Sequence, residues 1–210
     1  MGTRSHDHGH NHDPRRGPGT HGNPADLAEY LARLEDPARV EWQKPDDVVR
    51  ALGLAPGMTI GEIGPGPGFF TRRLAAAVGE GGRVLAAEVV PEILAALRER
   101  LQGIANVTPI LADPDDPRLP RASCDRILVV NTYHHFPDGP AYLRRLGAAL
   151  KPGGEIVNVD FEKRETPMGP PVEHRVSRED FLRDAEKAGL VARALELGLP
   201  HQYAIALRLR

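Results

Sequence analysis

The segment EIGPGPG at residues 62–68 decides the fold class, because it joins a short apolar run, MTIGEIG at 58–64, to an amphipathic run, FFTRRLAAAVG at 69–79. Runs of these lengths predict a strand followed by a helix. Glycine permits the sharp turn between them and lets a ligand approach the backbone closely. We therefore predict a ligand-binding loop at the carboxyl end of the first strand.

The same alternation continues toward the carboxyl terminus. Strands are predicted at 83–89, 106–111, 125–131, 154–161, 191–197 and 201–210, and helices at 91–101, 139–150 and 177–189. Alternating strands and helices indicate an α/β fold with a mostly parallel sheet. Only residues 198–200 separate the last two strands, which is too short for a parallel crossover, so the last strand is expected to be antiparallel.

Composition limits the alternatives. The chain has 210 residues, a formal net charge of −2 and one cysteine. The charge disfavours a nucleic-acid partner, and a single cysteine excludes an intramolecular disulfide. No apolar run approaches the roughly 18 residues of a membrane span, and the polar start does not resemble a signal peptide. We expect a cytoplasmic protein without a membrane partner.

The amino-terminal region divides into a tail and a cover. Residues 1–23 hold no aliphatic side chain beyond Met1, so a disordered, His-rich tail is predicted. Its histidines could bind Zn²⁺ or Ni²⁺, or could simply be solvated, and we expect no metal in the active site. Helical patterns in 24–56 predict a cover on a core at 57–210, so that 24–210 form one domain.

The loop favours one kind of ligand. A dinucleotide fingerprint requires glycine at the sixth position, where Phe69 stands, and Pro65 and Pro67 lack the N–H groups that cradle phosphate. The carboxylate of Glu62 suits a cation instead. S-adenosylmethionine has an ammonium and a sulfonium but no phosphate. Glu88, 24 residues beyond Gly64, can accept hydrogen bonds from both ribose hydroxyls.

Three further segments follow predicted strands or form one: LADPDD at 111–116, NTYHH at 131–135 and LKPGGEIVNVDF at 150–161. With the loop and Glu88, they resemble the class I S-adenosylmethionine-dependent methyltransferases over roughly residues 45–210. The small-molecule branch that includes the ubiquinone and menaquinone C-methyltransferases is the most similar. The resemblance implies a Rossmann-like doubly wound sheet of seven strands, with the last strand antiparallel and helices on both faces.

The resemblance also implies where the cofactor binds. The methionine part would lie at the loop, the ribose at Glu88, the adenine beside Val89 with its amino group at Asp113, and the reactive methyl near Asn131. Ala112 stands where the family usually has glycine before that aspartate. The implied cofactor-binding residues are Glu62, Gly64, Gly66, Gly68, Glu88, Val89, Asp113 and Asn131.

Catalytic candidates follow the fourth strand. Methyl transfer from a sulfonium needs in-line approach, and a hydroxyl, amine or acidic carbon also needs a base. Tyr133, His134 and His135 stand next to the expected methyl group, and His134 is favoured over His135 as the base. The segment is assumed to be extended, so the two adjacent histidine side chains are expected to point apart. In the alternative, one histidine only hydrogen-bonds the loop.

Acceptor-binding candidates lie outside the motifs. Trp42 precedes the sheet and either lines the acceptor pocket or packs under the cover. His174 and Arg175 belong to a Pro-rich segment after the fifth strand, which is either a lid or an ordinary surface loop.

The sequence thus predicts transfer of a methyl group from S-adenosylmethionine to a small-molecule acceptor. Two other functions stay open. One is an NAD(P)-dependent oxidoreductase, which Phe69 and the loop prolines disfavour. The other is a non-catalytic metal-binding or cofactor-sensing module on the same sheet.

Overall fold

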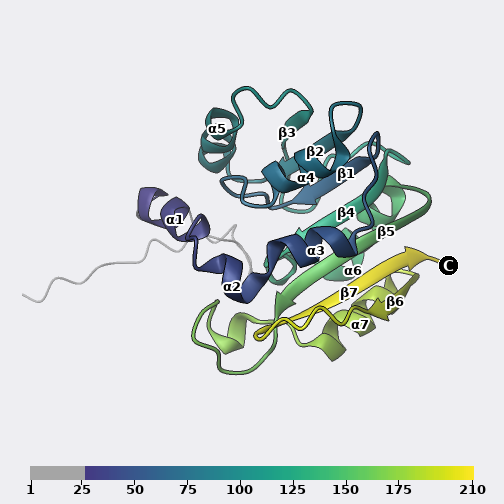
Figure 1. Cartoon of the computed structure of the whole chain (residues 1–210). Helices are drawn as coiled ribbons and strands as arrows, with labels where there is room; N and C mark the ends of the chain where they lie inside the picture. Colours follow the sequence, from purple (N-terminus) through teal and green to yellow (C-terminus); the bar gives the residue numbers. More distant parts are fainter. Residues whose placement is uncertain (1–26) are drawn as a thin grey trace, which may run out of the picture.

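The structure is a computed structural model that describes residues 27–210, so the predicted tail lies outside the described residues. One seven-stranded sheet with the order β3-β2-β1-β4-β5-β7-β6 forms its centre (Figure 1). Strands β1 to β5 are parallel to their neighbours, whereas β7 is antiparallel to β5 and β6. The predicted α/β fold is therefore confirmed. The strands are β1 (Thr59–Ile63), β2 (Arg83–Glu88), β3 (Val107–Leu111), β4 (Cys124–Val130), β5 (Leu150–Phe161), β6 (Leu190–Ala194) and β7 (Gln202–Leu209).

The connection between β6 and β7 differs from the prediction. It spans residues 195–201 rather than 198–200, because β6 ends at Ala194. Leu195, Leu197 and Leu199 have the alternation of a strand, but they pack against the hydrophobic core instead of continuing the sheet. The antiparallel direction of β7 is as expected.

Helices cover both faces of the sheet (Figure 1). On one face, Val48 and Leu74 pack with Val157 and Val159 of β5. On the other, Leu143 and Phe181 belong to a second cluster of buried residues. Alternation along β5 produces both faces, because successive side chains of a strand point to opposite sides. The helices concerned are α3 (Pro45–Ala51) and α4 (Thr71–Val78) on the first face, and α6 (Gly139–Ala149) and α7 (Arg178–Lys187) on the second, while α5 (Pro91–Arg100) packs beside β2 and β3.

Two short helices precede α3. Helix α1 (Leu27–Leu34) has the predicted apolar stripe, and α2 (Arg39–Gln43) was not predicted, since five residues are too few to show a helical period. Helix α2 ends at Lys44, whose φ of 45° is left-handed. The resulting bend places α1 and α2 beside the end of the sheet where β5 stops (Figure 1).

Candidate functional site

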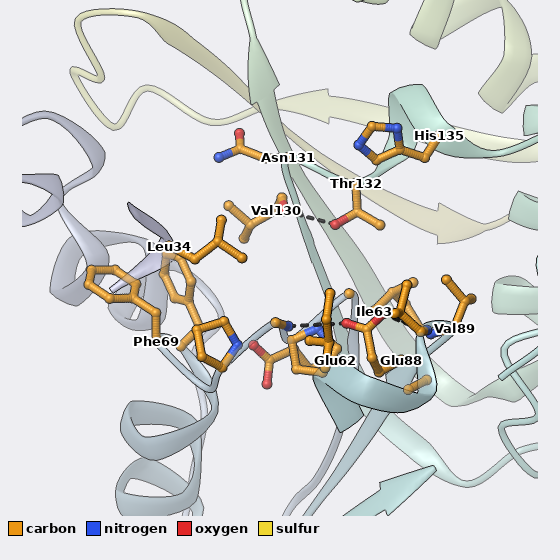
Figure 2. A pocket seen from close by; sticks show the side chains of 18 of the residues that line it. Leu34, Glu62, Ile63, Phe69, Glu88, Val89, Val130, Asn131, Thr132 and His135 are labelled. Carbon is orange, nitrogen blue, oxygen red and sulfur yellow. Dashed lines mark hydrogen bonds between the residues drawn. The ribbon is translucent and has the colours of Figure 1, made fainter. Parts of the chain in front are cut away.

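A cavity of about 740 Å³ opens at the carboxyl ends of β1, β2 and β4. Figure 2 shows Asn131 and His135 on one side of it, with Glu62 and Glu88 on the other. Parallel α/β sheets bind ligands at this edge. The cavity therefore coincides with the site predicted from the glycine loop.

The loop glycines adopt backbone conformations that other residues rarely take. Gly64, Gly66 and Gly68 have φ values of 67°, 55° and 101°. A Cβ atom on Gly64 would lie 2.5 Å from Thr132 Oγ1, and one on Gly66 would lie 3.2 Å from Leu34 Cδ1. Gly64 and Gly66 line the cavity, whereas Gly68 does not and instead approaches α5. The backbone conformation of this loop thus requires glycine at these positions.

Glu88 presents a fixed carboxylate at the end of β2. The residue is 5% exposed and lines the cavity. Its oxygens accept hydrogen bonds from the backbone N–H groups of Val89 at 2.9 Å, Val90 at 3.1 Å and Gly66 at 3.3 Å. Burial raises the pKa of this carboxyl group above its ordinary value. A carboxylate anchored in this way suits a pair of ligand hydroxyls, and Val89 beside it is exposed at the cavity rim.

Glu62 carries a buried oxygen without a partner. The residue is 4% exposed and lines the cavity, and Oε2 has no hydrogen-bond partner among the described residues. Burial raises the pKa of Glu62 to about 7. An unpartnered buried carboxylate is costly unless a cation or donor reaches it. The ammonium group of S-adenosylmethionine meets this requirement, so the residues present fit that cofactor.

Asn131 and Thr132 form the opposite wall at the end of β4. Asn131 is left-handed, with φ 52°, a conformation that asparagine tolerates better than most residues. Both residues line the cavity, and Thr132 Oγ1 donates to the backbone oxygen of Val130 at 2.9 Å. The side chains that face the cavity here are polar.

The three catalytic candidates occupy a 3₁₀ helix, η1 (Tyr133–His135), so the premise of an extended segment is wrong. His135 lines the cavity, but Tyr133 and His134 do not. Tyr133 is buried in the core and its hydroxyl donates to Asp184 Oδ2 at 2.9 Å. The His134 side chain is 3% exposed and its Nδ1 lies 3.1 Å from Asp160. Of the three, only His135 is placed to reach a bound molecule.

Asp113 lies next to the cavity rather than in its wall. Both carboxylate oxygens accept hydrogen bonds from Arg118, at 2.8 and 3.0 Å. The following residue, Pro114, lines the cavity. The predicted contact with the adenine amino group would require Asp113 to exchange this ion pair for the ligand.

The predicted acceptor-binding residues also lie outside the cavity wall. The Trp42 ring packs against Phe161 with a centroid distance of 5.6 Å, and His174 is exposed on the short helix η2 (Val172–His174). Arg175 is 4% exposed and donates to the carbonyl oxygens of Glu162, Arg164, Met168 and Pro170. Arg175 therefore fixes the Pro-rich segment internally.

Sequence reasoning missed the wall contributed by α1 and α2. Arg39 lies over the Phe69 ring at 4.1 Å and donates to Gln43 Oε1, and burial lowers its pKa to about 10. The apolar stripe of α1 could have identified Tyr30 and Leu34, whereas no pattern marks Arg39. The cavity residues that were not predicted include Tyr30, Arg33, Leu34, Arg39, Phe69, Phe70, Phe136 and Tyr142.

Two other properties bear on the kind of site. Within residues 27–210, no group of three or more His, Cys, Asp or Glu side chains is arranged to hold a metal ion. Among the same residues, no helix is long and apolar enough to cross a membrane.

Comparison with known proteins supports this interpretation of the cavity. Residues 60–154 match a family described as a methyltransferase domain. The ubiquinone/menaquinone biosynthesis C-methyltransferase UbiE of Ectopseudomonas mendocina is 30% identical over 123 residues, which cover 57% of this chain and 48% of that protein. The UbiE protein of Shewanella sp. strain ANA-3 is 28% identical over 118 residues, 55% of this chain and 47% of that protein. The chain thus spans about half the length of the curated relatives it matches.

A solved structure is similar over more of the chain. The crystal structure of a SAM-dependent methyltransferase from Aquifex aeolicus is 29% identical, with a TM-score of 0.81, and the match covers 87% of this chain and 97% of that one. The matched family covers β1, the glycine loop and β4, which form the cavity, and the structural match extends to the antiparallel end of the sheet. These matches in sequence and structure support a class I S-adenosylmethionine-dependent methyltransferase.

Proposed function

We propose that this protein transfers the methyl group of S-adenosylmethionine to a small-molecule acceptor in the cavity at the ends of β1, β2 and β4. The observation that carries the proposal is the buried carboxylate of Glu62, a residue that lines that cavity and whose Oε2 lacks a hydrogen-bond partner among the described residues. When bound, the cofactor supplies a methyl group on a positively charged sulfur, which is already activated for transfer.

The charges on the cavity wall match those of the cofactor. Glu62 would pair with the ammonium group, and Glu88, already fixed by backbone N–H groups, would accept the ribose hydroxyls. Arg39 would bind the carboxylate, since it lines the cavity and its hydrogen bonds, to Gln43 Oε1 and to the backbone oxygen of Leu34, leave its positive charge without a carboxylate partner among the described residues. The chain therefore orients the cofactor with fixed charges. Orientation and fixed charges supply most of the rate enhancement in a reaction of this kind.

A small molecule is the acceptor that the site favours. The cavity of about 740 Å³ is enclosed partly by apolar side chains such as Leu34 and Phe69. The net charge of −2 provides no basic surface for nucleic acid. The UbiE relatives are named for quinone biosynthesis, so phenols and quinols are the first acceptors to test. We place the enzyme in the cytoplasm and keep the predicted division of the chain into a tail at 1–23, a cover at 24–56 and a core at 57–210.

Calorimetric titration of the full chain tests the proposal. S-adenosylmethionine and S-adenosylhomocysteine should bind at one site, and NADH should not bind. Incubation with S-adenosylmethionine and a panel of phenols, quinols and amines should then release S-adenosylhomocysteine with at least one acceptor. Binding of NADH alone would favour the oxidoreductase alternative. Tight Zn²⁺ or Ni²⁺ binding without turnover on any acceptor would favour the metal-binding module.

A further inference from the structure

A buried carboxylate–imidazole pair lies behind the cavity wall. Asp160, near the end of β5, is 0% exposed, and its two oxygens each lie 3.1 Å from His134 Nδ1. The backbone N–H of Phe161 donates to the same carboxylate at 2.8 Å. An ionised carboxylate can only accept, so the proton between the two side chains is carried by His134 Nδ1. The pair therefore fixes both the ring orientation and the tautomer of His134.

His134 in turn contacts the histidine on the cavity wall. The ring centroids of His134 and His135 are 3.9 Å apart with 59° between the ring planes. His135 lines the cavity and His134 does not. In the 3₁₀ helix, His135 therefore lies at the cavity, and His134 lies between the cavity and Asp160.

The neighbours of Asp160 do not replace His134. The Tyr203 ring lies on the strand paired with Asp160, but its hydroxyl donates to the backbone oxygen of Val176 at 3.3 Å. The nearby Tyr133 hydroxyl donates to Asp184. Among the residues that the structure describes, His134 is the only side chain that hydrogen-bonds to Asp160.

We propose that Asp160 is a positioning residue, which fixes the ring of His134 and through it holds His135 in place on the cavity wall. Burying a carboxylate and an imidazole is expensive, and an apolar pair of similar volume is often at least as stable. Stability alone therefore does not explain the buried pair of Asp160 and His134, whereas a role in orienting His135 does. As far as it concerns the acceptor, this inference rests on the proposed function, because His135 is the histidine that a bound acceptor could reach.

The experiment is ¹⁵N NMR on the full chain labelled at histidine. In the native protein, His134 should carry its proton on Nδ1, and the His134 and His135 rings should show a nuclear Overhauser effect. Asp160→Ala should shift protonation toward Nε2, remove that ring contact and broaden the His135 signals. Asp160→Asn keeps an oxygen that can accept from Nδ1, so it should restore part of the native spectrum.

Two further variants make the test specific. Asp184→Ala removes the other side-chain anchor of the same 3₁₀ helix, the bond from Tyr133, and should leave the His134 tautomer unchanged. If Asp160→Ala does not fold, His134→Phe keeps a ring in place without the bond to Asp160 and should also release His135. Native His135 spectra in any folded variant that lacks this bond would overturn the proposal.

Turnover supplies a second measurement once the panel yields an acceptor. Asp160→Ala should lower kcat by up to about 10²-fold, the scale expected for a small misplacement of a reacting group, with S-adenosylmethionine affinity near native. The loss should match that of His135→Ala, and the double variant should be no slower, because both changes remove one arrangement. Additive losses would contradict the inference. The NMR result needs no turnover, so failure of the proposed function would be recognised separately.

Discussion

The side chain of Gln202, the first residue of β7, donates from Nε2 to Asn131 Oδ1 at 2.6 Å. Asn131 is the left-handed residue that follows β4 and lines the cavity. Gln202 is 4% exposed, and its own Oε1 has no partner among the described residues. The antiparallel last strand therefore fixes a polar side chain that is 71 residues away in the chain and faces the ligand.

Gln202→Ala should destabilise the fold and loosen the cavity wall. It leaves the half-buried Asn131 oxygen without its donor, which costs about 1 kcal/mol, the lower end of the range for a buried group. For a domain of this size, the melting temperature should fall by roughly 2–4 °C per kcal/mol. Differential scanning calorimetry measures this change. Gln102→Ala, at an exposed position, is the matched control and should leave the melting temperature unchanged.

The affinity for S-adenosylmethionine should depend on pH through Glu62. The pKa of this buried carboxyl is raised to about 7, so it is mainly protonated below that pH in the empty protein. Binding of an ammonium group requires the carboxylate. Affinity should therefore increase as pH rises through about 7 and level off above it, with proton release on binding below 7. Calorimetric titration in two buffers of different ionisation enthalpy measures both effects.

Glu62→Gln should remove this pH dependence and weaken binding throughout. The same change should stabilise the empty protein above pH 7. Because the folded pKa lies above the unfolded value of 4.5, stability falls as pH rises from 4.5 to about 7 and stays low beyond it. The amide does not ionise, so the variant should gain on the order of 1–3 kcal/mol at pH 8. A native-like pH profile of binding in Glu62→Gln would show that another group titrates.

The cofactor-binding side of the site could be predicted because its residues belong to local sequence motifs. The other side could not, because its contacts join residues that are far apart in the chain. Gly64 and Gly66 stand in one turn whose left-handed backbone favours glycine, and Glu62 precedes this turn in β1, so the three residues form one local sequence pattern. Glu88 ends β2 and Asn131 follows β4, the two strands on either side of β1, and strand–helix alternation predicts that such strand ends meet at one edge of the sheet. The partners Asp160 and Gln202 come from β5 and β7, and no spacing in the sequence connects them to β4.

The same distinction explains the catalytic candidates. His134 and His135 are adjacent, and two adjacent residues show no periodicity from which to predict which side chain faces the cavity. A 3₁₀ helix turns about 120° per residue, whereas the prediction assumed an extended segment. Arg175 is a predicted acceptor-binding residue because it belongs to the Pro-rich segment that follows the fifth strand and could form a lid. Its four backbone acceptors, between Glu162 and Pro170, become visible only once the Pro-rich segment is folded.

Glu88→Gln should weaken S-adenosylmethionine binding by more than about tenfold, because hydrogen bonds to a charged acceptor are worth roughly 1.5–3 kcal/mol each. The isosteric amide has one acceptor fewer for the backbone N–H groups of Gly66, Val89 and Val90. Isothermal titration measures the change. Glu92→Gln alters another acidic residue of the cavity wall, but an exposed one, and should bind nearly as the native protein does. Equal losses in both variants would indicate a general charge effect.

Gly66→Ala should reduce cofactor binding, and Gly66→Val should abolish it. The added Cβ would lie 3.2 Å from Leu34 Cδ1, so the Leu34 side chain must shift by a few tenths of an ångström where it lines the cavity. Gly53→Ala is the control: its φ of 58° is similarly left-handed, yet nothing lies within 4 Å of the added atom. Both alanine variants should lose about 1–2 kcal/mol of stability from backbone strain. Only the change at Gly66 should also lower affinity, and comparable affinities in the two would contradict the assigned position of the ligand.

Arg39→Gln should weaken binding of S-adenosylmethionine but not of its decarboxylated analogue. The Arg39 guanidinium lies over the ring of Phe69, and both residues line the cavity; Nε and Nη2 donate to Gln43 Oε1, and Nη1 donates to the backbone oxygen of Leu34. Loss of a charged hydrogen bond to the cofactor carboxylate corresponds to roughly tenfold or more in affinity. The analogue has no carboxylate, so its affinity should change little, and the difference between the two ligands isolates this one interaction from any general loosening of α2. Arg33→Gln changes an exposed arginine of the same wall and should affect both ligands only slightly. If Arg39→Gln weakens both ligands equally, Arg39 acts by packing on Phe69, and the cofactor carboxylate is bound elsewhere.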